Sequence, residues 1–128
     1  MRSGLKKRSL STGSTPDAFG LRFQVPLSRQ FDIRNQAFAE VIKSIPRGKI
    51  ATYGQVASAA GYPRYHRAVA RFLSAIPPDE LPWQRVIGAG GEIKVTGRAA
   101  SEQRLRLKME GVTFVGRRVD LERHLYLF

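Results

Sequence analysis

The sequence contains no cysteine and only two histidines, His66 and His124. The absence of cysteine excludes disulfides, thiolate zinc sites and thiol nucleophiles. Two histidines that lie far apart in the sequence make neither a convincing metal site nor a Ser-His-Asp catalytic set. No phosphate-binding Walker loop is present either. We therefore expect no metal ion and no other cofactor.

Long apolar runs are also missing, since no stretch of the chain is long enough to span a bilayer. The basic N-terminus is not followed by the apolar core of a secretory signal. Its arginine- and serine-rich composition leaves a transit peptide as the weaker alternative. We expect no association with a membrane.

Acidic residues are few compared with basic ones. The 128 residues include 22 Lys and Arg against 10 Asp and Glu, which gives a formal net charge of +12 and a pI near 11.1. A charged surface that only aids solubility would be the simpler interpretation. So large an excess of one sign, however, destabilises the folded state through repulsion between like charges. A chain this basic usually binds a polyanion, most often nucleic acid.

The length of the chain suits one folded domain with a single core. Residues 1–30 are predicted to be a flexible basic N-terminal extension, because residues 9–16 lack hydrophobic periodicity and contain breakers of regular structure. This extension either adds nonspecific phosphate contacts or is an inert leader, and we favour the first. Residues 31–128 are predicted to form the DNA-binding domain.

A first helix is predicted to begin directly after Asp32, which is a plausible N-cap, and to end at Pro46. Apolar residues at helical spacing form its buried stripe, namely Ile33, Ala37, Phe38, Val41 and Ile42.

Two short helices joined by a glycine-containing turn are predicted next, which is the arrangement of a helix-turn-helix. The first covers residues 53–60, because Thr52 and Gln55 have the spacing of a capping box and Gly61 is a natural stop. The second covers residues 64–75 and would be the recognition helix.

The recognition helix has two predicted faces. Its apolar stripe consists of Val69, Phe72, Leu73 and Ile76. The opposite face consists of Arg64, Arg67, Ala68 and Arg71. Three arginines there can reach phosphates or a groove. A solvated basic face is the commoner meaning of such a run, but the overall charge favours contact with DNA.

The second half of the domain should contain the strands. Residues 82–87 and 92–95 favour β-structure on either side of a glycine cluster, so they are predicted to form a hairpin or wing. A helix over residues 100–110 follows, with Leu105 and Met109 turned inward.

A last small hairpin is predicted over residues 112–121, and the apolar tail of residues 125–128 should fold back on the core. The predicted fold class is therefore α+β and mostly helical: a winged helix-turn-helix-like domain with a small β wing.

Four blocks of the sequence resemble the DNA-binding domain of O6-alkylguanine-DNA alkyltransferases. They are residues 45–57, 66–69, 82–87 and 110–111, and their order and spacing match that family across about residues 31–115. One such block would be weak support, whereas four in register are strong. The block Pro82-Trp83-Gln84-Arg85-Val86-Ile87 resembles the active-site signature Pro-Cys-His-Arg-Val.

Two departures from that signature decide the function that the resemblance implies. Trp83 stands where the family has its acceptor cysteine, and Gln84 stands where it has the proton-relay histidine. This pattern resembles the alkyltransferase-like proteins. The resemblance implies a protein that is not an enzyme, that binds O6-alkylguanine in double-stranded DNA and that flags the lesion for nucleotide excision repair.

The resemblance also implies roles for residues of the helix-turn-helix. Arg67 would fill the space that a flipped base leaves, since a planar guanidinium can stack and donate hydrogen bonds. Tyr53 would make a close steric contact with the phosphate of the target nucleotide and would bind the flipped guanine. Ala68 would lie close to the floor of the minor groove. Arg64 and Arg71 are expected to add contacts to DNA.

The lesion pocket that the resemblance implies is centred on Trp83. The main-chain carbonyls of Trp83 and Val86 would accept hydrogen bonds from the guanine edge. Thr96 and Arg98 would lie on the loop that closes the pocket. The flat indole of Trp83 would stack on the flipped base.

Three further residues are expected behind the pocket. Arg85 would hold the loop that carries Trp83 against neighbouring elements. Glu110 corresponds to the carboxylate that completes the relay in the transferases, and with cysteine and histidine both absent it would orient Gln84 or the backbone.

The expected partners follow from this reading: double-stranded DNA that contains O6-alkylguanine and nucleotide excision repair proteins. The protein is expected to be a monomer, located in the cytoplasm or nucleoid if it is bacterial and in the nucleus if it is eukaryotic. A sequence-specific winged-helix regulator is the first alternative, but it does not explain residues 82–86. An alkyltransferase with a substitute nucleophile is the second, although indole is a poor alkyl acceptor and no cysteine is available.

Overall fold

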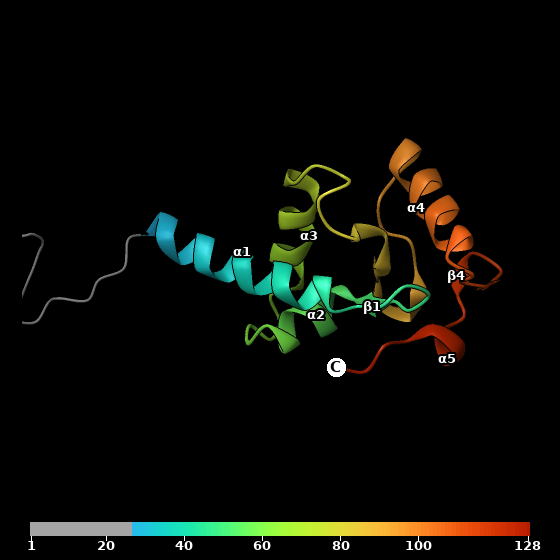
Figure 1. The fold of residues 1–128 in the computed structure, drawn as a ribbon, viewed down its shortest axis with the longest axis horizontal. Coiled ribbons are helices and arrows are strands. Elements are labelled where there is room, and N and C mark those ends of the chain that lie inside the picture. The colour runs from blue at the N-terminus through green and yellow to red at the C-terminus, as the bar shows by residue number, and fades with distance from the viewer. Residues whose placement is uncertain (1–26) are drawn as a thin grey trace, which may run out of the picture. The chain divides into compact units, whose positions relative to one another are not determined.

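The structure is a computed structural model that describes residues 27–128. Its elements, in chain order, are α1 (Leu27–Lys43), β1 (Ala51–Thr52), α2 (Tyr53–Ala59), α3 (His66–Ala75), the short 3-10 helix η1 (Trp83–Arg85), β2 (Val86–Ile87), the 3-10 helix η2 (Ala89–Gly91), α4 (Gly97–Met109), β3 (Phe114–Val115), β4 (Arg118–Val119) and α5 (Leu121–His124) (Figure 1). The described part is mainly helical with two short sheets, as predicted. Residues 1–26 of the predicted extension lie outside the described residues.

Helix α1 begins at Leu27, so the prediction that Asp32 caps its start is wrong. Asp32 is an exposed residue inside the helix. The sequence explains the difference, because nothing in residues 27–31 stops a helix and Pro26 stands directly before the first turn, where proline is well tolerated. The predicted domain boundary at residue 30 therefore falls within α1.

The apolar stripe of α1 is confirmed over most of its length. Phe38 and Ile42 are fully buried, and Val41 is partly buried against the same core. Ile33 is 48% exposed, so it does not belong to the buried part of the stripe.

The start of α2 is confirmed in detail. The Gln55 N–H donates to Thr52 Oγ1 (3.1 Å), and the Thr52 N–H donates to Gln55 Oε1 (2.9 Å), which completes the capping box. Helix α2 ends at Ala59, one residue earlier than predicted. Gly61 follows with a φ of 91°, the left-handed conformation that glycine adopts after a helix.

Helix α3 begins at His66, two residues later than predicted. Arg64 has a φ of 71°, which no residue of a right-handed helix adopts, so Arg64 lies in the connection and not on the recognition helix. The apolar stripe is confirmed, since Val69 is fully buried and Phe72 and Leu73 pack against the same cluster.

Ala68 is not on the exposed face of α3, so that prediction is wrong. It is only 5% exposed and belongs to the same core cluster as Val69. Consecutive helical residues differ by about 100° around the axis, so a wide buried face can include both. The main contacts of α3 are with α2. The small methyl group of Ala68 leaves room for the two helices to pack closely.

The strand pairing differs from the predicted hairpin. Strand β2 pairs in parallel with β1, in the register Ala51 with Val86 and Thr52 with Ile87. Residues 82–87 and 92–95 therefore form no wing. The segment between them contains η2, and the Gly88 N–H donates to the Glu92 carbonyl (2.8 Å). Glu92 forms an isolated β-bridge with Arg118 of β4.

The β1–β2 pair separates two clusters of buried side chains. Ala51 and Val86 belong to the cluster formed by α1, α2 and α3. Ile50 and Ile87 belong to the second cluster, together with Leu107 of α4. Successive residues of an extended segment point to opposite faces, so Val86 and Ile87 of β2 contribute to different clusters, as do Ile50, directly before β1, and Ala51.

Helix α4 presents a different face to the core than predicted. Leu105 and Met109 are 55% and 69% exposed, so the prediction that they point inward is wrong. Gln103 and Leu107 are buried instead. The Gln103 Nε2 group donates to the carbonyls of Gln84 (3.1 Å) and Val86 (2.9 Å), and these bonds explain why a polar side chain faces inward.

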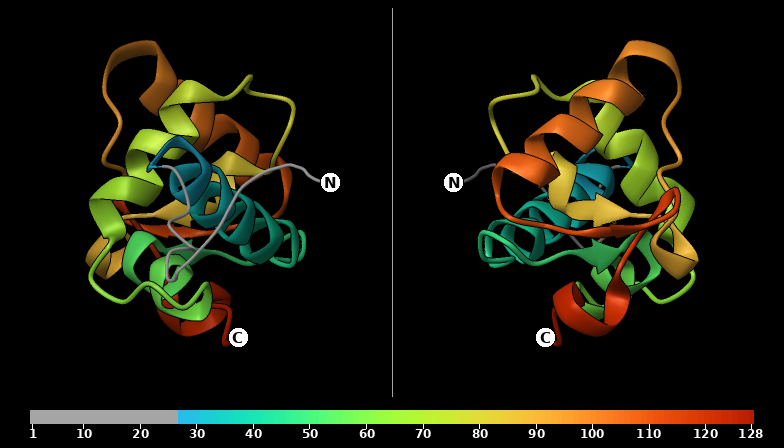
Figure 2. Two further views of the ribbon diagram at one scale, coloured as in Figure 1. Left: turned by 90° about the vertical axis from the view of Figure 1, so that its left-hand side faces the viewer. Right: turned by 90° about the vertical axis from the view of Figure 1, so that its right-hand side faces the viewer.

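The C-terminal segment is confirmed in outline. Strands β3 and β4 form the predicted hairpin, and the Tyr126 N–H donates to the Ile50 carbonyl (2.8 Å). Leu127 and Phe128 are exposed, so only the first half of the tail covers the core. The C-terminus lies at the opposite end of residues 33–128 from the start of α4 (Figures 1 and 2).

Two absences hold for residues 27–128. None of their helices combines the length and the hydropathy that crossing a membrane requires. Within the same residues, no three His, Asp or Glu side chains are grouped closely enough to hold a metal ion.

Candidate nucleic-acid interface

A cavity of about 960 Å³ opens beside α3 and the segment that carries η1. This volume lies within the range of about 300–1,000 Å³ that is typical of sites for small ligands. Its lining is mostly apolar with a few basic and hydroxyl groups, and it consists of Thr52, Tyr53, Gly54, His66, Arg67, Ala70, Leu73, Ser74, Ile76, Pro78, Trp83, Gly88, Ala89, Lys94, Val95 and Ala99.

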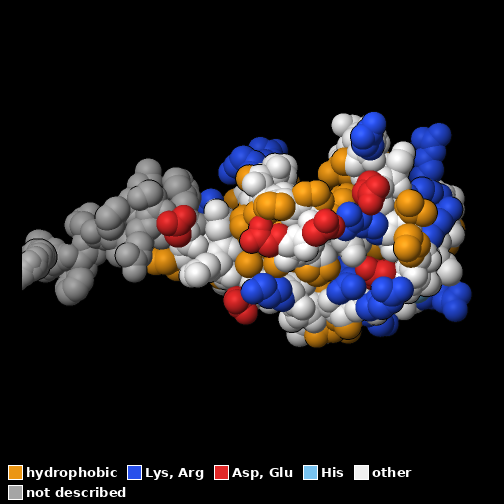
Figure 3. Space-filling view, turned by 45° about the horizontal axis from the view of Figure 1, so that its top comes forward, with side chains coloured by type: hydrophobic (Ala, Val, Ile, Leu, Met, Phe, Trp, Pro, Cys, Tyr) orange, Lys and Arg blue, Asp and Glu red, His pale blue; other side chains and the backbone are white. Residues whose placement is uncertain are grey.

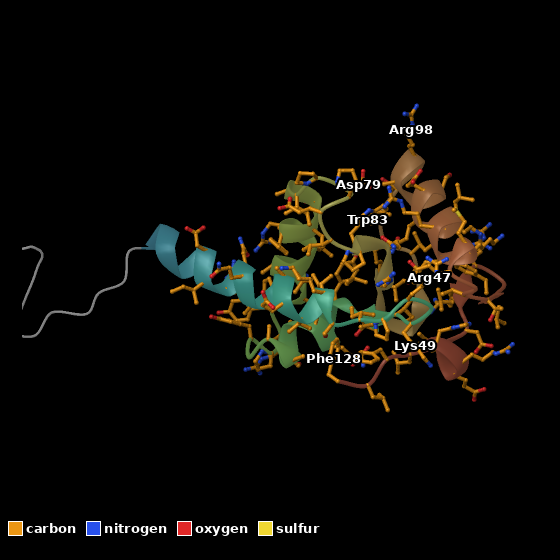
Figure 4. The ribbon with its side chains drawn as sticks, in the orientation of Figure 1. Arg47, Lys49, Asp79, Trp83, Arg98 and Phe128 are labelled. Atoms are coloured by element: carbon orange, nitrogen blue, oxygen red, sulfur yellow. The ribbon has the colours of Figure 1, made fainter. Side chains whose placement is uncertain are left out.

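Three residues that the sequence singles out meet at this cavity. Tyr53 is the first residue of α2, Arg67 lies in the first turn of α3, and Trp83 is the first residue of η1. The helix-turn-helix and the parallel β1–β2 pair bring these separate segments together. In the view of Figure 4, Trp83 lies between α3 and α4.

The Trp83 indole is partly buried and is held mainly by packing. Its Nε1 atom is buried without a hydrogen-bond partner among the described residues. The guanidinium of Arg106, on α4, lies 5.6 Å from the centroid of the ring, within the range of a cation–π contact. The ring is therefore both a wall of the cavity and a contact surface for α4.

Tyr53 is partly buried, and its ring packs against the core cluster. Burial raises the pKa of its phenol above the ordinary value of 10.0, because the phenolate would lose hydration. The phenol therefore remains protonated at neutral pH and can donate a hydrogen bond. Within the described residues its hydroxyl has no partner, so it is available to a ligand in the cavity.

A cluster of polar groups surrounds Glu110 and contacts η1, the segment that carries Trp83; we call this segment the Trp83 loop. The carboxylate accepts hydrogen bonds from Gln84 Nε2 (2.8 Å), Arg85 Nε (3.0 Å) and the Gly48 N–H (2.9 Å). Arg85 Nη1 also donates to the Ile45 carbonyl (2.9 Å). These are the contacts expected of residues that hold the loop and orient Gln84.

The surroundings of Glu110 act on its pKa in opposite directions. Burial raises the pKa, but the hydrogen bonds from Arg85, the Gly48 N–H and Gln84 outweigh it, and the pKa is lowered below its ordinary value of 4.5. Glu110 is therefore ionised at neutral pH and forms a buried ion pair with Arg85, whose side chain is 17% exposed against 4% for Glu110.

Three predicted pocket residues do not line the cavity. Val86 is fully buried, and its carbonyl already accepts from Gln103, just as the Trp83 carbonyl accepts from the Val86 N–H. Thr96 is exposed and its side chain does not cap α4. Arg98 points away from Trp83 at the start of α4 (Figure 4). The predicted roles of these three residues in lesion binding therefore stay predictions.

The predicted basic face of α3 is only partly present. Arg67 and Arg71 are exposed on the helix, Arg64 is exposed in the connection, and Ala68 is buried. Figure 3 shows Lys and Arg side chains over α3 and more densely over the part of the molecule that holds α4 and β4. The exposed arginines beside the cavity are the groups that could contact phosphates.

Several residues of the cavity could not be singled out from the sequence. Leu73 and Ile76 follow the spacing of a core stripe, yet both also form an apolar wall of the cavity. Lys94 lies in the predicted wing and pairs with Glu92 at 3.3 Å. His66 belongs to the resemblance block of residues 66–69, which was the one available indication.

The sequence of this chain is similar to those of several known proteins. A family model described as "6-O-methylguanine DNA methyltransferase, DNA binding domain" matches residues 34–112. The DNA base-flipping protein of Escherichia coli (strain K12) is 36% identical over 117 residues, which cover 90% of this chain and 91% of that protein. Alkyltransferase-like protein 1 of Schizosaccharomyces pombe is 40% identical over 76 residues, which cover 57% of this chain and 70% of that protein.

The fold is similar to solved structures as well. The crystal structure of S. pombe Atl1 in complex with damaged DNA containing O6-carboxymethylguanine superimposes with a TM-score of 0.66 and 30% sequence identity. The match covers 76% of this chain and 97% of that chain. The helix-turn-helix fold predicted from the sequence is thereby confirmed.

Proposed function

Because the chain belongs to the family of the 6-O-methylguanine DNA methyltransferase DNA-binding domain, we propose that it binds O6-alkylguanine in double-stranded DNA without removing the alkyl group. The observation that carries the proposal is the meeting of Tyr53, Arg67 and Trp83 at one cavity beside the helix-turn-helix. The names of the similar proteins, a base-flipping protein and a protein bound to damaged DNA, support it.

In the proposed mechanism α3 enters the minor groove and the damaged guanine rotates out of the duplex into the cavity. Extruding a base costs a few kcal/mol, and less when the base is already poorly paired. Arg67 fills the vacated space, where its planar guanidinium can stack between the neighbouring bases. The Tyr53 hydroxyl donates a hydrogen bond to the flipped nucleotide.

Selection of the lesion follows from the lining of the cavity. Stacking a base on Trp83 contributes roughly 1–3 kcal/mol. The apolar wall that includes Leu73, Ile76 and Pro78 can cover the alkyl group, with about 0.8 kcal/mol for each methylene removed from water. Stacking is gained by any base that leaves the duplex, which a poorly paired alkylated guanine does more readily than an intact one. Burial of the alkyl group is gained by the lesion alone, and neither contribution needs a covalent bond.

The chemistry of the chain supports binding over transfer. The sequence has no cysteine, and Trp83 lies where we infer that the transferases carry their acceptor. An indole ring is a poor acceptor of an alkyl group, and Gln84 cannot relay a proton as histidine can. Incubation with DNA carrying a labelled methyl group, followed by mass measurement of the protein, tests this point. A mass increase of one methyl group would favour an alkyltransferase.

The fate of the lesion belongs to the same proposal. A protein that holds a lesion without repairing it needs a second system to act on the DNA. We propose that the chain acts as a monomer where the DNA is kept, in the nucleoid or the nucleus, and flags the lesion for nucleotide excision repair. Lesion removal measured in extracts with and without the protein tests this part separately.

The deciding experiment compares Kd for duplexes of one sequence that carry guanine, O6-methylguanine or larger O6-alkyl adducts, at one stated salt concentration, since salt strongly changes nonspecific binding. Trp83→Ala should reduce the preference for the lesion about tenfold, as expected from the loss of roughly 1–3 kcal/mol of stacking. Binding to undamaged DNA should change little. Equal loss on both duplexes would contradict the pocket role and favour a sequence-specific regulator.

A further inference from the structure

Arg106 connects three parts of the molecule that meet at the cavity wall, although it does not line the cavity itself. Its Nε group donates to Glu102 Oε2 (2.8 Å), one turn earlier on α4. Its Nη2 group donates to Asp79 Oδ1 (3.2 Å), and its Nη1 group donates to the Pro78 carbonyl (3.5 Å). The planar fork of a guanidinium can make these bonds at once, which an ammonium group cannot.

The same guanidinium covers the Trp83 indole, at 5.6 Å from the ring centroid. Because Arg106 is not a lining residue, it contacts the ring from outside the cavity. Pro78, by contrast, does line the cavity. Arg106 therefore holds both the ring and a neighbouring piece of the wall from behind.

Among residues 27–128, no hydrogen bond restrains the orientation of the Trp83 ring. Its Nε1 atom is buried and makes no hydrogen bond with the described residues. A buried indole N–H normally finds an acceptor, which then fixes the ring. Here the guanidinium supplies the directional contact that such a hydrogen bond would otherwise provide.

We infer that Arg106 is a positioning residue of the lesion site: it holds the Trp83 ring and the Pro78–Asp79 wall in the arrangement that receives a flipped base. The inference rests on the proposed function. A ring that is already held in place loses less conformational freedom when a base stacks on it, so positioning increases affinity for the lesion. It has no such effect on undamaged DNA whose bases stay in the stack.

A plain surface ion pair is the competing explanation of these contacts. The Asp79 side chain is 90% exposed, and an exposed ion pair contributes little to stability. That explanation predicts that removing Arg106 changes neither the environment of Trp83 nor the choice between damaged and undamaged DNA.

Helix α4 offers a matched control in Arg104. Its guanidinium covers the Phe114 ring at 4.3 Å, so it also packs on an aromatic residue, but not on Trp83. Arg106→Met and Arg104→Met each remove one positive charge from the same helix and keep an unbranched apolar side chain. The change in net charge is therefore the same in the two variants, although only Arg106 forms ion pairs, with Glu102 and Asp79.

The first measurement uses the protein without DNA. Trp83 is the single tryptophan of the chain, so all tryptophan emission reports on this ring. We expect Arg106→Met to shift the emission of Trp83 and to increase its quenching by acrylamide about twofold. Arg104→Met should leave both readouts as in the wild type.

The second measurement compares Kd for an O6-methylguanine duplex and an undamaged duplex of the same sequence. Arg106→Met should lower the ratio of the two affinities about fivefold, which corresponds to about 1 kcal/mol, within the range of cation–π contacts. Arg104→Met should leave the ratio unchanged. Thermal unfolding of both variants shows that each is folded at the temperature of the assay.

Asp79→Asn provides an independent variant, because a side chain that is 90% exposed can be changed without unfolding the domain. It removes the negative charge that attracts Arg106 but keeps an oxygen acceptor, so it weakens one anchor and should lower the lesion preference about twofold. If Arg106→Met does not fold, Asp79→Asn decides the question alone. Emission and lesion preference that both match the Arg104→Met control would overturn the inference.

Failure of the proposed function would look different. In that case the wild-type protein would bind damaged and undamaged duplexes equally, and the role of Arg106 in lesion preference would fall with it. Trp83 emission in the absence of DNA would still show whether Arg106 orients the ring. A change in emission together with an unchanged, clear lesion preference would overturn the inference while leaving the proposed function intact.

Discussion

Two neighbouring residues, Trp83 and Gln84, have very different surroundings. On the Trp83 side lies a cavity with an apolar wall, where the indole N–H and the Tyr53 hydroxyl have no hydrogen-bond partner among residues 27–128. On the Gln84 side, the Glu110 carboxylate accepts from three groups, and Gln103 donates to two main-chain carbonyls. The side-chain oxygens of Gln84 and Gln103 are buried there without a partner among the same residues, but the donors and the carboxylate are paired internally. The Gln84 side is therefore held together by hydrogen bonds, whereas the Trp83 side presents unpaired donors to a cavity.

This difference indicates that the Gln84 side of this short loop serves stability and the Trp83 side serves binding. Buried hydrogen-bonded networks rigidify a structure, because each bond is stronger in a low-dielectric interior and each lost bond is costly. A binding site needs groups that are held in place from behind and remain unpaired in front. Changes on the Glu110 side should therefore affect stability, whereas changes on the Trp83 side should affect binding.

The largest expected effect on stability comes from Glu110→Ala. It leaves the Arg85 guanidinium without its carboxylate in a mostly buried position, which typically costs about 3–5 kcal/mol of unfolding free energy. Denaturant unfolding measures the loss. Glu122→Ala, at an exposed position of α5, should stay within about 0.5 kcal/mol of the wild type. A comparable loss for both variants would mean that the polar cluster does not stabilise the loop.

Gln103→Met should have a smaller effect, about 1–2 kcal/mol. It removes the donor to the carbonyls of Gln84 and Val86, but it also removes the Gln103 Oε1 atom, which is buried without a partner. The two consequences partly cancel. Gln36→Met, at an exposed position of α1, is the matched control for denaturant unfolding.

The contribution of the Glu110 ion pair should depend on pH. Its pKa in the folded protein is lower than the ordinary value of 4.5, so its stabilisation is present in full above that value. It is lost as the pH falls through the folded-state pKa, because the carboxylate then becomes protonated. The difference in unfolding free energy between the wild type and Glu110→Gln should therefore shrink from pH 7 toward pH 3. A constant difference would show that the ionised carboxylate is not what stabilises the loop.

The smallest effect on stability is expected for Arg67→Ala, within about 0.5 kcal/mol, because this side chain is exposed. Its effect on binding should be large. Loss of a guanidinium that fills the space of the flipped base should weaken binding of the damaged duplex about tenfold, equivalent to about 1.4 kcal/mol. Arg71→Ala, which removes an expected phosphate contact, should weaken binding of damaged and undamaged duplexes alike. A clear loss of unfolding free energy for Arg67→Ala would contradict the expectation that residues beside the cavity affect binding and not stability.

Several features of the fold could be predicted because they depend on residues close together in the sequence. The capping box of Thr52 and Gln55 needs only one helical turn, and Gly61 ends α2 through its own backbone freedom. Features that depend on distant partners were missed. Strand β2 pairs with β1 and not with the nearby residues 92–95.

Helix α4 shows the same limit for a single helix. Apolar residues stand at positions 105, 107 and 109, a spacing that does not define one helical face. Gln103 determines which face of α4 is buried, because its amide donates hydrogen bonds to the carbonyls of Gln84 and Val86. No pattern within the helix reveals that partner, so Leu105 and Met109 were assigned to the wrong face.

The candidate site divides in the same way. Tyr53, Arg67 and Trp83 could be singled out from the sequence because they stand in blocks that resemble a known family. Val86, Thr96 and Arg98 were placed with them on the same grounds, but burial and direction keep these three out of the cavity. Proximity along the chain does not determine which way a side chain points.

Composition and local hydrogen bonding establish that the chain is strongly basic, that it has no thiol for alkyl transfer and that its helix-turn-helix begins at a capping box. No other part of the domain is needed for these properties. In contrast, the place of Trp83 in the cavity wall, the pairing of Glu110 and the contact of Arg106 with the indole depend on the packed domain. These contacts join segments far apart in the chain, and packing of the whole domain sets the distances between them.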